Sequence, residues 1–274
     1  MKISQAIVFY NEQKPQSKPF ANEVCDWLGA HQIKARAITS FDNLSGIDLL
    51  ICTGGDGAML RCAREAVHFH IPILGINCGS LGFLAACEQT DFQEALSDLL
   101  EGKFSIQERI MLAVDIQDEE GKVQHLLALN DCVVRADKPR ALTVEANFNT
   151  HSLPSYFGDG VLVSTPTGST AYALAAGGPI VAPGVEGLLV TPICPHSLTQ
   201  RPLLLPANGK LTLCPQLKTP MDGACLSVDG QINLSLPAGT RVQISNSTLK
   251  ANFLLNPKRG FFTMLNRKLN WGSR

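Results

Sequence analysis

A glycine-rich loop that contains one carboxylate is the first feature of the sequence that could do chemistry. The loop, Thr53-Gly54-Gly55-Asp56-Gly57, follows an apolar stretch and precedes a stretch with helical spacing. Glycines allow a ligand to approach the backbone closely, and a helix N-terminus offers unpaired N–H groups and a positive dipole end. This combination is typical of phosphate binding. It is neither a Walker A loop nor a dinucleotide-binding Gly-x-Gly-x-x-Gly loop, because Leu60 occupies the third glycine position and no Gly-Lys-Ser/Thr follows.

Asp56 is the most informative residue of this loop. A carboxylate among amides that bind phosphate repels the ligand, so its presence indicates a specific task. It could hold a magnesium ion, directly or through water, or accept the proton of a hydroxyl that attacks a phosphoryl group. The alternative is a tight turn in which Asp56 only caps the helix that follows.

A second glycine loop, residues 75–84, follows the next apolar stretch of the same half of the chain. Successive parallel strands place the loops at their carboxyl ends along one edge of the sheet, where ligands of open α/β sheets bind. Two such loops side by side could surround a triphosphate.

Two polar segments in the second half could bind an uncharged part of a ligand. Residues 158–172 contain six hydroxyl side chains at a strand-to-helix turn, which suits sugar hydroxyls, phosphates or an amide. The alternative is a turn whose side chains bond their own backbone. Asn130 and Asp131 end the apolar run 126–129 and offer an amide beside a carboxylate, which suits a ribose diol or an adenine edge. The alternative there is an ordinary loop turn.

The elements that must position these residues follow two different periods. Up to about residue 105, apolar strands alternate with helical stretches, which predicts a parallel sheet covered on both faces. After Ile106 most stretches alternate apolar and polar residues, which predicts antiparallel sheet packed on sheet. We expect strands over residues 6–10, 34–38, 48–52, 72–76, 111–116, 141–148, 210–214, 226–236 (a hairpin turning at Asp229-Gly230) and 241–245, and helices over 20–28, 58–69, 91–100, 169–176 and 261–271.

Composition excludes several classes of protein. The chain has 274 residues, of which 45% are apolar and 17% charged, and its net charge is −1. Nucleic acid as main partner is disfavoured because phosphate backbones require a basic face. The longest mostly apolar stretch, 171–190, contains four glycines, two prolines and a glutamate, unlike a membrane span. Nine cysteines without a Cys-x-x-Cys pair, and a first segment unlike a signal peptide, predict a reduced, cytoplasmic protein.

Taken together, these segments resemble the NAD kinase family, which phosphorylates the 2′-hydroxyl of the adenosine ribose of NAD to make NADP. The resemblance is closest to the bacterial, single-module form. Gly-Gly-Asp-Gly is shared with diacylglycerol kinases and phosphofructokinases, whereas the segment from Asp159 to Tyr172 is more specific. The matching stretches are 54–57, 75–83, 108–109, 130–131, 159–160, 165–172, 177–180, 195–198, 201–203, 229–231 and 268–272.

The resemblance implies a fold of class α/β plus β. Its N-terminal domain is Rossmann-like with a parallel sheet, its C-terminal domain is β-sandwich-like, and the final helix packs back on the N-terminal domain. We expect the first domain over residues 1–105 with 257–274, and the second over 106–256. The resemblance also implies homodimers or homotetramers, with the dinucleotide site completed at domain and subunit boundaries, and no membrane partner.

The implied site follows residue by residue. Asp56 would be the general base on the 2′-hydroxyl, and magnesium would neutralise charge on the phosphates of ATP, with no metal site built by the protein itself. The residues implied to bind the dinucleotide or belong to its pocket are Asp56, Gly57, Asn130, Asp131, Asp159, Thr167, Thr170, Ala171, Tyr172 and Gln231. For a basic contact to phosphate, Arg61 on the helix after the loop is a candidate, although a solvated helix residue is an equal alternative.

Three positions depart from the family pattern. Asp131 replaces the usual Glu, which keeps the charge but withdraws it by one methylene. Ala58 replaces a hydroxyl or amide residue and removes one ligand contact. Phe157 replaces an Arg found in many relatives, so that a basic contact would have to come from Arg140. An aromatic side chain at 157 could instead stack on a base or on nicotinamide.

Two other functions stay open at this point. One is a kinase of a lipid or a sugar in the same superfamily, although no basic amphipathic membrane element and no dense Arg/Lys cluster supports it. The other is a dinucleotide sensor that kept the pocket and lost turnover, against which the intact Asp56 speaks. The phosphoryl donor, ATP or inorganic polyphosphate, is not settled by the sequence.

Overall fold

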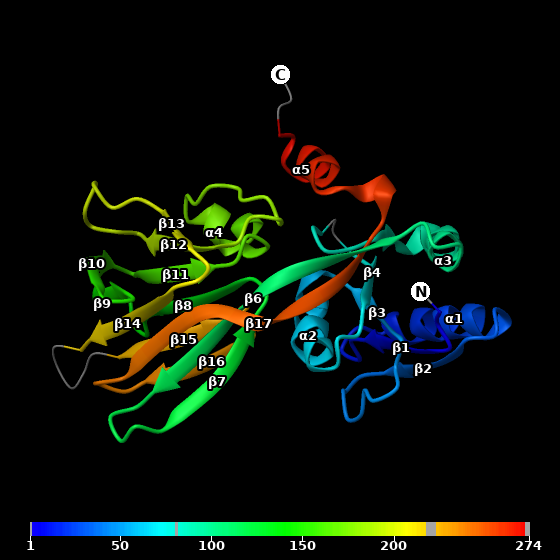
Figure 1. Ribbon diagram of the computed structural model, residues 1–274, viewed down its shortest axis with the longest axis horizontal. Helices are drawn as coiled ribbons and strands as arrows, with labels where there is room; N and C mark the ends of the chain where they lie inside the picture. Colours follow the sequence, from blue (N-terminus) through cyan, green and yellow to red (C-terminus); the bar gives the residue numbers. More distant parts are fainter. Residues whose placement is uncertain (1, 80–81, 218–222, 272–274) are drawn as a thin grey trace. The chain divides into compact units, whose positions relative to one another are not determined.

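The computed structural model describes residues 2–79, 82–217 and 223–271, and it divides into two compact units (Figure 1). Unit 1 comprises Met1–Arg109 and Lys250–Arg274, and unit 2 comprises Ile110–Leu249. The chain passes between the units inside two long strands, β6 (Ser105–Gln117) and β17 (Arg241–Leu255).

Unit 1 is built on a parallel sheet. Its strands lie in the order β2-β1-β3-β4, with β5 also paired to β4 and Phe253 of β17 paired to Ile73 of β4. All residues of β3 and β4 are buried, as expected for strands covered on both faces. The strands are β1 (Gln5–Tyr10), β2 (Lys34–Ile38), β3 (Leu49–Gly54), β4 (Ile73–Asn77) and β5 (Cys87–Glu88).

The helices of unit 1 confirm the predicted alternation of strand and helix. They are α1 (Ser17–Ala30), α2 (Asp56–Ala66), η1 (Val67–Phe69), η2 (Gln89–Asp91), α3 (Phe92–Leu100), η4 (Pro257–Arg259) and α5 (Phe261–Leu269). One core, formed by side chains of α1, α3 and the sheet, includes Val24, Ile51, Leu74 and Leu96. Helix α2 begins at Asp56, two residues before the predicted start, so the carboxylate belongs to the first turn of the helix.

The final helix belongs to unit 1 and buries Met264 and Leu265, which confirms that it packs back on the first domain. It is shorter than predicted: it ends at Leu269, because Asn270 adopts a left-handed conformation that terminates the helix. Trp271, included in the predicted helix, lies beyond its end and is 54% exposed.

Unit 2 consists mostly of antiparallel strands in two sheets, which confirms the predicted second fold class. One sheet has the order β13-β12-β11-β8-β15-β16, and the other includes β10-β9-β14-β17 together with the β6–β7 hairpin. Its further strands are β7 (Val123–Ala128), β8 (Asp131–Ala136), β9 (Leu142–Phe148), β10 (His151–Gly158), β11 (Gly160–Ser164), β12 (Gly187–Ile193), β13 (Leu203–Pro206), β14 (Lys210–Gln216), β15 (Ala224–Val228) and β16 (Ile232–Leu236).

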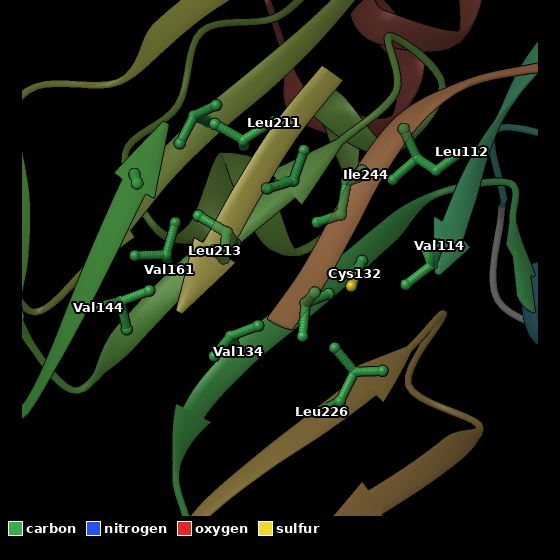
Figure 2. Packing of buried hydrophobic residues seen from close by; sticks show 14 of the residues in the cluster. Leu112, Val114, Cys132, Val134, Val144, Val161, Leu211, Leu213, Leu226 and Ile244 are labelled. Carbon is green, nitrogen blue, oxygen red and sulfur yellow. The ribbon is translucent and has the colours of Figure 1, made fainter. Parts of the chain in front are cut away.

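The core of unit 2 lies between inward-facing side chains of these two sheets (Figure 2). Val134 of β8 and Leu226 of β15 come from one sheet, and Leu213 of β14 and Ile244 of β17 come from the other. Alternation of apolar and polar residues therefore places one face of each strand in this core.

One element of unit 2 differs from its prediction. The helix expected over 169–176 is split into η3 (Gly168–Thr170) and α4 (Tyr172–Ala175). Ala171 separates them with φ −101° and ψ −125°, far from helical values. The alanine content of the stretch favours a helix, but the local backbone bends at the position where the resemblance places the ligand pocket.

Candidate active site

The Gly-Gly-Asp-Gly loop joins β3 to α2 as the sequence predicts. β3 ends at Gly54, Gly55 is the N-cap in an extended conformation, and Asp56 is the first helical residue. A Cβ on Gly54 would lie 2.8 Å from Cβ of Ala58, so a larger residue does not fit there. The alternative in which the Asp56 side chain caps the helix is wrong, because no side-chain cap bond is present and the cap residue is Gly55.

The Asp56 carboxylate instead bonds the second glycine loop. Phe83 N donates to Oδ2 at 3.0 Å and Leu84 N donates to Oδ1 at 3.2 Å. Gly82 lies under the carboxylate so closely that a Cβ there would be 2.6 Å from Cγ of Asp56. The two glycine loops predicted from the sequence therefore meet at this carboxylate, at the edge where Gly54 of β3 pairs with Asn77 of β4. Ser80 and Leu81 of the second loop lie outside the described residues.

Arg61 is placed on aromatic rings. Its guanidinium carbon lies 5.3 Å from the ring centroid of Phe9 and 5.5 Å from that of Phe41. Those two rings stack on each other with centroids 4.7 Å apart. In this structure the side chain therefore makes a cation–π contact, on the side of α2 that faces β1.

In unit 2 the polar residues gather around the turn between β15 and β16. Asp229 and Gly230 both have positive φ, 51° and 66°, and Gln231 N donates to the carbonyl of Val228 at 3.0 Å across them. The Asp229 carboxylate accepts backbone N–H bonds from Leu129 at 3.1 Å, Asn130 at 2.8 Å and Asp131 at 3.2 Å. This buried carboxylate thus fixes the predicted Asn130-Asp131 segment.

Asp131 is a buried carboxyl group beside a second carboxylate. Burial raises its pKa to about 7, and the negative charge of Asp229 is the second cause. Near neutral pH the Asp131 carboxyl therefore carries a proton in a large share of molecules, and it can then donate a hydrogen bond as well as accept one.

The hydroxyl-rich segment is bonded to the same loop. Thr165 Oγ1 donates to the carbonyl of Leu129 at 2.5 Å, and Thr165 N donates to the carbonyl of Asn130 at 2.9 Å. A Cβ on Gly168 would lie 2.7 Å from Cα of Asn130, so only glycine allows this close approach. Thr170 Oγ1 bonds the carbonyl of Thr167 at 3.2 Å, as the alternative of a self-bonded turn describes.

Two cavities open over this part of unit 2 and share two lining residues, Arg135 and Tyr172. The larger, about 500 Å³, is lined by Asn130, Asp131, Val133, Arg135, Ala171, Tyr172, Ser227, Asp229, Gly230 and Asn233. The smaller, about 300 Å³, is lined by Arg135, Ala136, Asp137, Lys138, Pro139, Arg140, Asp159, Tyr172 and Ile193. Pockets of this size accommodate small organic ligands.

Six of the sequence-predicted site residues line these cavities. Asn130, Asp131, Arg140, Asp159, Ala171 and Tyr172 are brought together there, whereas Thr167, Thr170 and Gln231 are not among the lining residues. Sequence reasoning missed Asp229 and Arg135 as site residues. The sequence marks Asp229-Gly230 as a hairpin turn and as part of the family match over 229–231, but neither pattern gives Asp229 a role. Arg135 is an ordinary exposed residue of a strand. Phe157 packs its ring edge-on against His196, with centroids 4.8 Å apart.

Neither a cluster of metal-ligating side chains nor a membrane-spanning helix is found among the described residues. Within 2–79, 82–217 and 223–271, no group of three or more His, Cys, Asp or Glu side chains is placed to hold a metal ion. No helix in the described part of the chain is long and apolar enough to cross a membrane.

Comparisons with known proteins agree on one family. The model of the ATP-NAD kinase N-terminal domain matches residues 34–104, and that of the ATP-NAD kinase C-terminal domain matches residues 129–255. The chain is 38% identical over 268 residues to an NAD kinase of Desulforamulus reducens, covering 92% of each chain. It is 34% identical over 285 residues to an NAD kinase of Geobacter metallireducens, covering 99% of this chain and 100% of the other.

Solved structures show the same fold. Yeast NADH kinase complexed with NADH superposes with a TM-score of 0.88 at 22% identity, covering 99% of this chain and 89% of the other. An NAD kinase from Archaeoglobus fulgidus in complex with ATP gives a TM-score of 0.77 at 24% identity, covering 94% and 95%.

Proposed function

The chain belongs to the NAD kinase family, and we propose that it transfers the γ-phosphoryl group of ATP to the 2′-hydroxyl of the adenosine ribose of NAD, giving NADP and ADP. The observation that carries this proposal is the Asp56 carboxylate, held by two backbone amides in the first turn of α2 within a phosphate-binding loop. Among the described residues, no contact favours the lipid or sugar kinase or the sensor.

We propose that the two cavities of unit 2 bind the dinucleotide. Asn130 and the carboxyl of Asp131 offer donors and acceptors for the adenosine, and Ala171 and Tyr172 offer an apolar surface in the same cavity. Asp159 and Arg140 line the smaller cavity, which suits the second nucleoside. Arg135 lines both cavities, so its guanidinium is suited to the pyrophosphate that joins the two nucleosides.

The remaining sequence-predicted residues do not line the two cavities, and we assign them supporting roles. Thr167 and Thr170 hold the turn that presents Tyr172, and Gln231 follows the Asp229-Gly230 turn. For Arg61 the proposal requires that the guanidinium leave the rings of Phe9 and Phe41 when ATP binds.

The proposed reaction uses Asp56 as the base. The ribose 2′-oxygen attacks the γ-phosphorus, the new O–P bond forms as the bond from the γ-phosphorus to the β,γ-bridging oxygen breaks, and ADP leaves with that oxygen. The hydroxyl proton passes to an oxygen of Asp56 as the transfer proceeds. Each Asp56 oxygen accepts one backbone N–H, and because each has two lone pairs it can accept the proton without losing that bond.

Magnesium enters this proposal with the phosphoryl donor. We infer that the ion is carried by the phosphates of ATP, as the resemblance implies. When bound there, the ion neutralises charge on the phosphates. The residues of Gly54–Gly57 and the N-terminus of α2 supply backbone N–H groups to the same anion.

The assembly and the compartment are also proposals. We infer a homodimer or homotetramer in the cytoplasm, each chain being built from the two domains expected over residues 1–105 with 257–274 and over 106–256. Support for association comes from β13, an edge strand of the six-stranded sheet on which Leu203 and Leu204 are exposed.

The test is formation of NADP by the purified protein with NAD, ATP and magnesium, together with Asp56→Asn. Loss of a general base costs about 10²- to 10⁴-fold in rate, so the variant should lose that much turnover. Its dissociation constant for NAD, measured by calorimetry, should stay near that of the wild type. A folded wild-type protein that binds NAD and forms no NADP would overturn the proposal in favour of a sensor.

A further inference from the structure

The ammonium group of Lys268, at the C-terminal end of α5, lies beside the Asp56 carboxylate. Lys268 Nζ is 3.9 Å from Asp56 Oδ2, and the two side chains are 34% and 30% exposed. The same ammonium lies over the ring of Phe83, 4.6 Å from its centroid. Lys268 is more than 180 positions along the chain from either of these residues, so no local sequence pattern joins the three groups.

Phe83 holds both members of this ion pair. Its backbone N–H donates to Asp56 Oδ2 at 3.0 Å, and the face of its ring lies under the ammonium of Lys268. A cation over a phenyl ring is attracted by the negative face of the ring. The ring therefore keeps the ammonium near the one carboxylate oxygen that Phe83 also bonds.

The segment that carries Lys268 is fixed to unit 1 by contacts that do not involve Asp56. Met264, one turn before Lys268, is buried together with Leu265. Ahead of the helix, Lys258 bonds Glu94 at 2.7 Å and Asp98 at 2.8 Å, and Arg259 bonds Glu88 at 2.8 Å. The position of the helix that carries Lys268 is therefore fixed by these contacts and does not depend on the pair with Asp56.

We propose that Lys268 is a positioning residue for the phosphoryl transfer, acting through Asp56. Its charge holds the Asp56 carboxylate against Phe83 and Leu84, and it offsets the repulsion between this carboxylate and an incoming polyphosphate. Without Lys268, only the hydrogen bonds from the backbone N–H groups of Phe83 and Leu84 hold the carboxylate when the negatively charged polyphosphate binds. This inference rests on the proposed function, since it requires Asp56 to be the base.

The test compares Lys268→Met and Lys268→Arg with Lys258→Met as a matched control. Lys258 belongs to the same terminal segment and pairs with α3 instead of Asp56, so its loss reports the structural cost of removing a lysine there. We expect Lys268→Met to lower kcat at least tenfold, Lys268→Arg to restore most of it, and Lys258→Met to leave kcat within twofold of the wild type. Melting temperatures of all variants establish that they are folded.

A double variant separates positioning from an independent effect. If Lys268 acts through Asp56, then adding Lys268→Met to Asp56→Asn lowers the residual kcat no further. An equal fold-loss in both backgrounds, or a Lys268→Met protein within twofold of the wild-type kcat, would overturn the inference. If wild type and Lys258→Met form NADP in that case, the proposed function stands and only the role of Lys268 falls.

Discussion

Gly82 is the position at which a single methyl group should disable the site without unfolding the protein. An alanine Cβ there would lie 2.6 Å from Cγ of Asp56, whereas ordinary contact begins at 3.4 Å. The added Cβ would lie closer still to Oδ1 of Asp56, so the carboxylate or the loop must shift by more than the roughly 0.8 Å that Cγ alone requires. Misplacement of a catalytic group by about 1 Å costs on the order of 10²-fold in rate, which corresponds to about 2.7 kcal/mol of transition-state stabilisation.

The assay is the initial rate of NADP formation by Gly82→Ala at saturating NAD and ATP. Gly79→Ala is the matched control, because it lies in the same loop and a Cβ added there would have no other atom within 4 Å. We expect kcat to fall about 100-fold for Gly82→Ala and to change less than about threefold for Gly79→Ala, with both melting temperatures near the wild type. A Gly82→Ala enzyme within about threefold of the wild-type kcat would refute the claim that this contact positions the base.

Two further predictions concern unit 2. Because the pKa of Asp131 is raised to about 7, the folded state keeps a proton that the unfolded state releases near pH 4. The free energy of unfolding of the wild type therefore falls as the pH rises from about 4 to about 7. Asn does not titrate, so Asp131→Asn should gain stability relative to the wild type as the pH rises over this interval, by at most about 4 kcal/mol measured by urea unfolding. A stability difference that does not change with pH would contradict the raised pKa. Arg135→Met should raise the KM for NAD about tenfold, because a charge-assisted bond to phosphate is lost, and should leave the KM for ATP unchanged. A rise in the KM for ATP alone would place Arg135 outside the dinucleotide site.

Much of the fold was predictable because its patterns are local. In unit 1, fully apolar stretches mark strands that are buried on both faces, and helical stretches lie between them. In unit 2, the alternation of apolar and polar residues marks the side chains that face the core. Alanine content predicts a helix over 169–176, and the split at Ala171 reflects a backbone conformation that helix propensity does not encode. Helical spacing extends the last predicted helix to Trp271, but the helix ends at Leu269.

The candidate site was predictable where one short segment carries its own chemistry. Asp56 stands out as a carboxylate in a phosphate loop, and the structure adds the two amides that hold it. Asp229 and Lys268 could not be found in this way, because their contacts join residues about 100 and more than 200 positions apart. In the sequence, Asp229 is explained as a turn residue and Lys268 as a lysine near the end of a helix. Only the tertiary structure shows their contacts with Asn130 and Asp56.

The most direct test of the account is the identity and stoichiometry of the product that the purified protein forms from NAD and MgATP. Phosphorus NMR, together with enzymatic measurement of ADP, follows both products of the transfer in one reaction. The account predicts one ADP for each NADP, with the new phosphomonoester on the 2′-oxygen of the adenosine ribose, and loss of both products in Asp56→Asn. Release of ADP without NADP, or a phosphate on another oxygen of NAD, would contradict it.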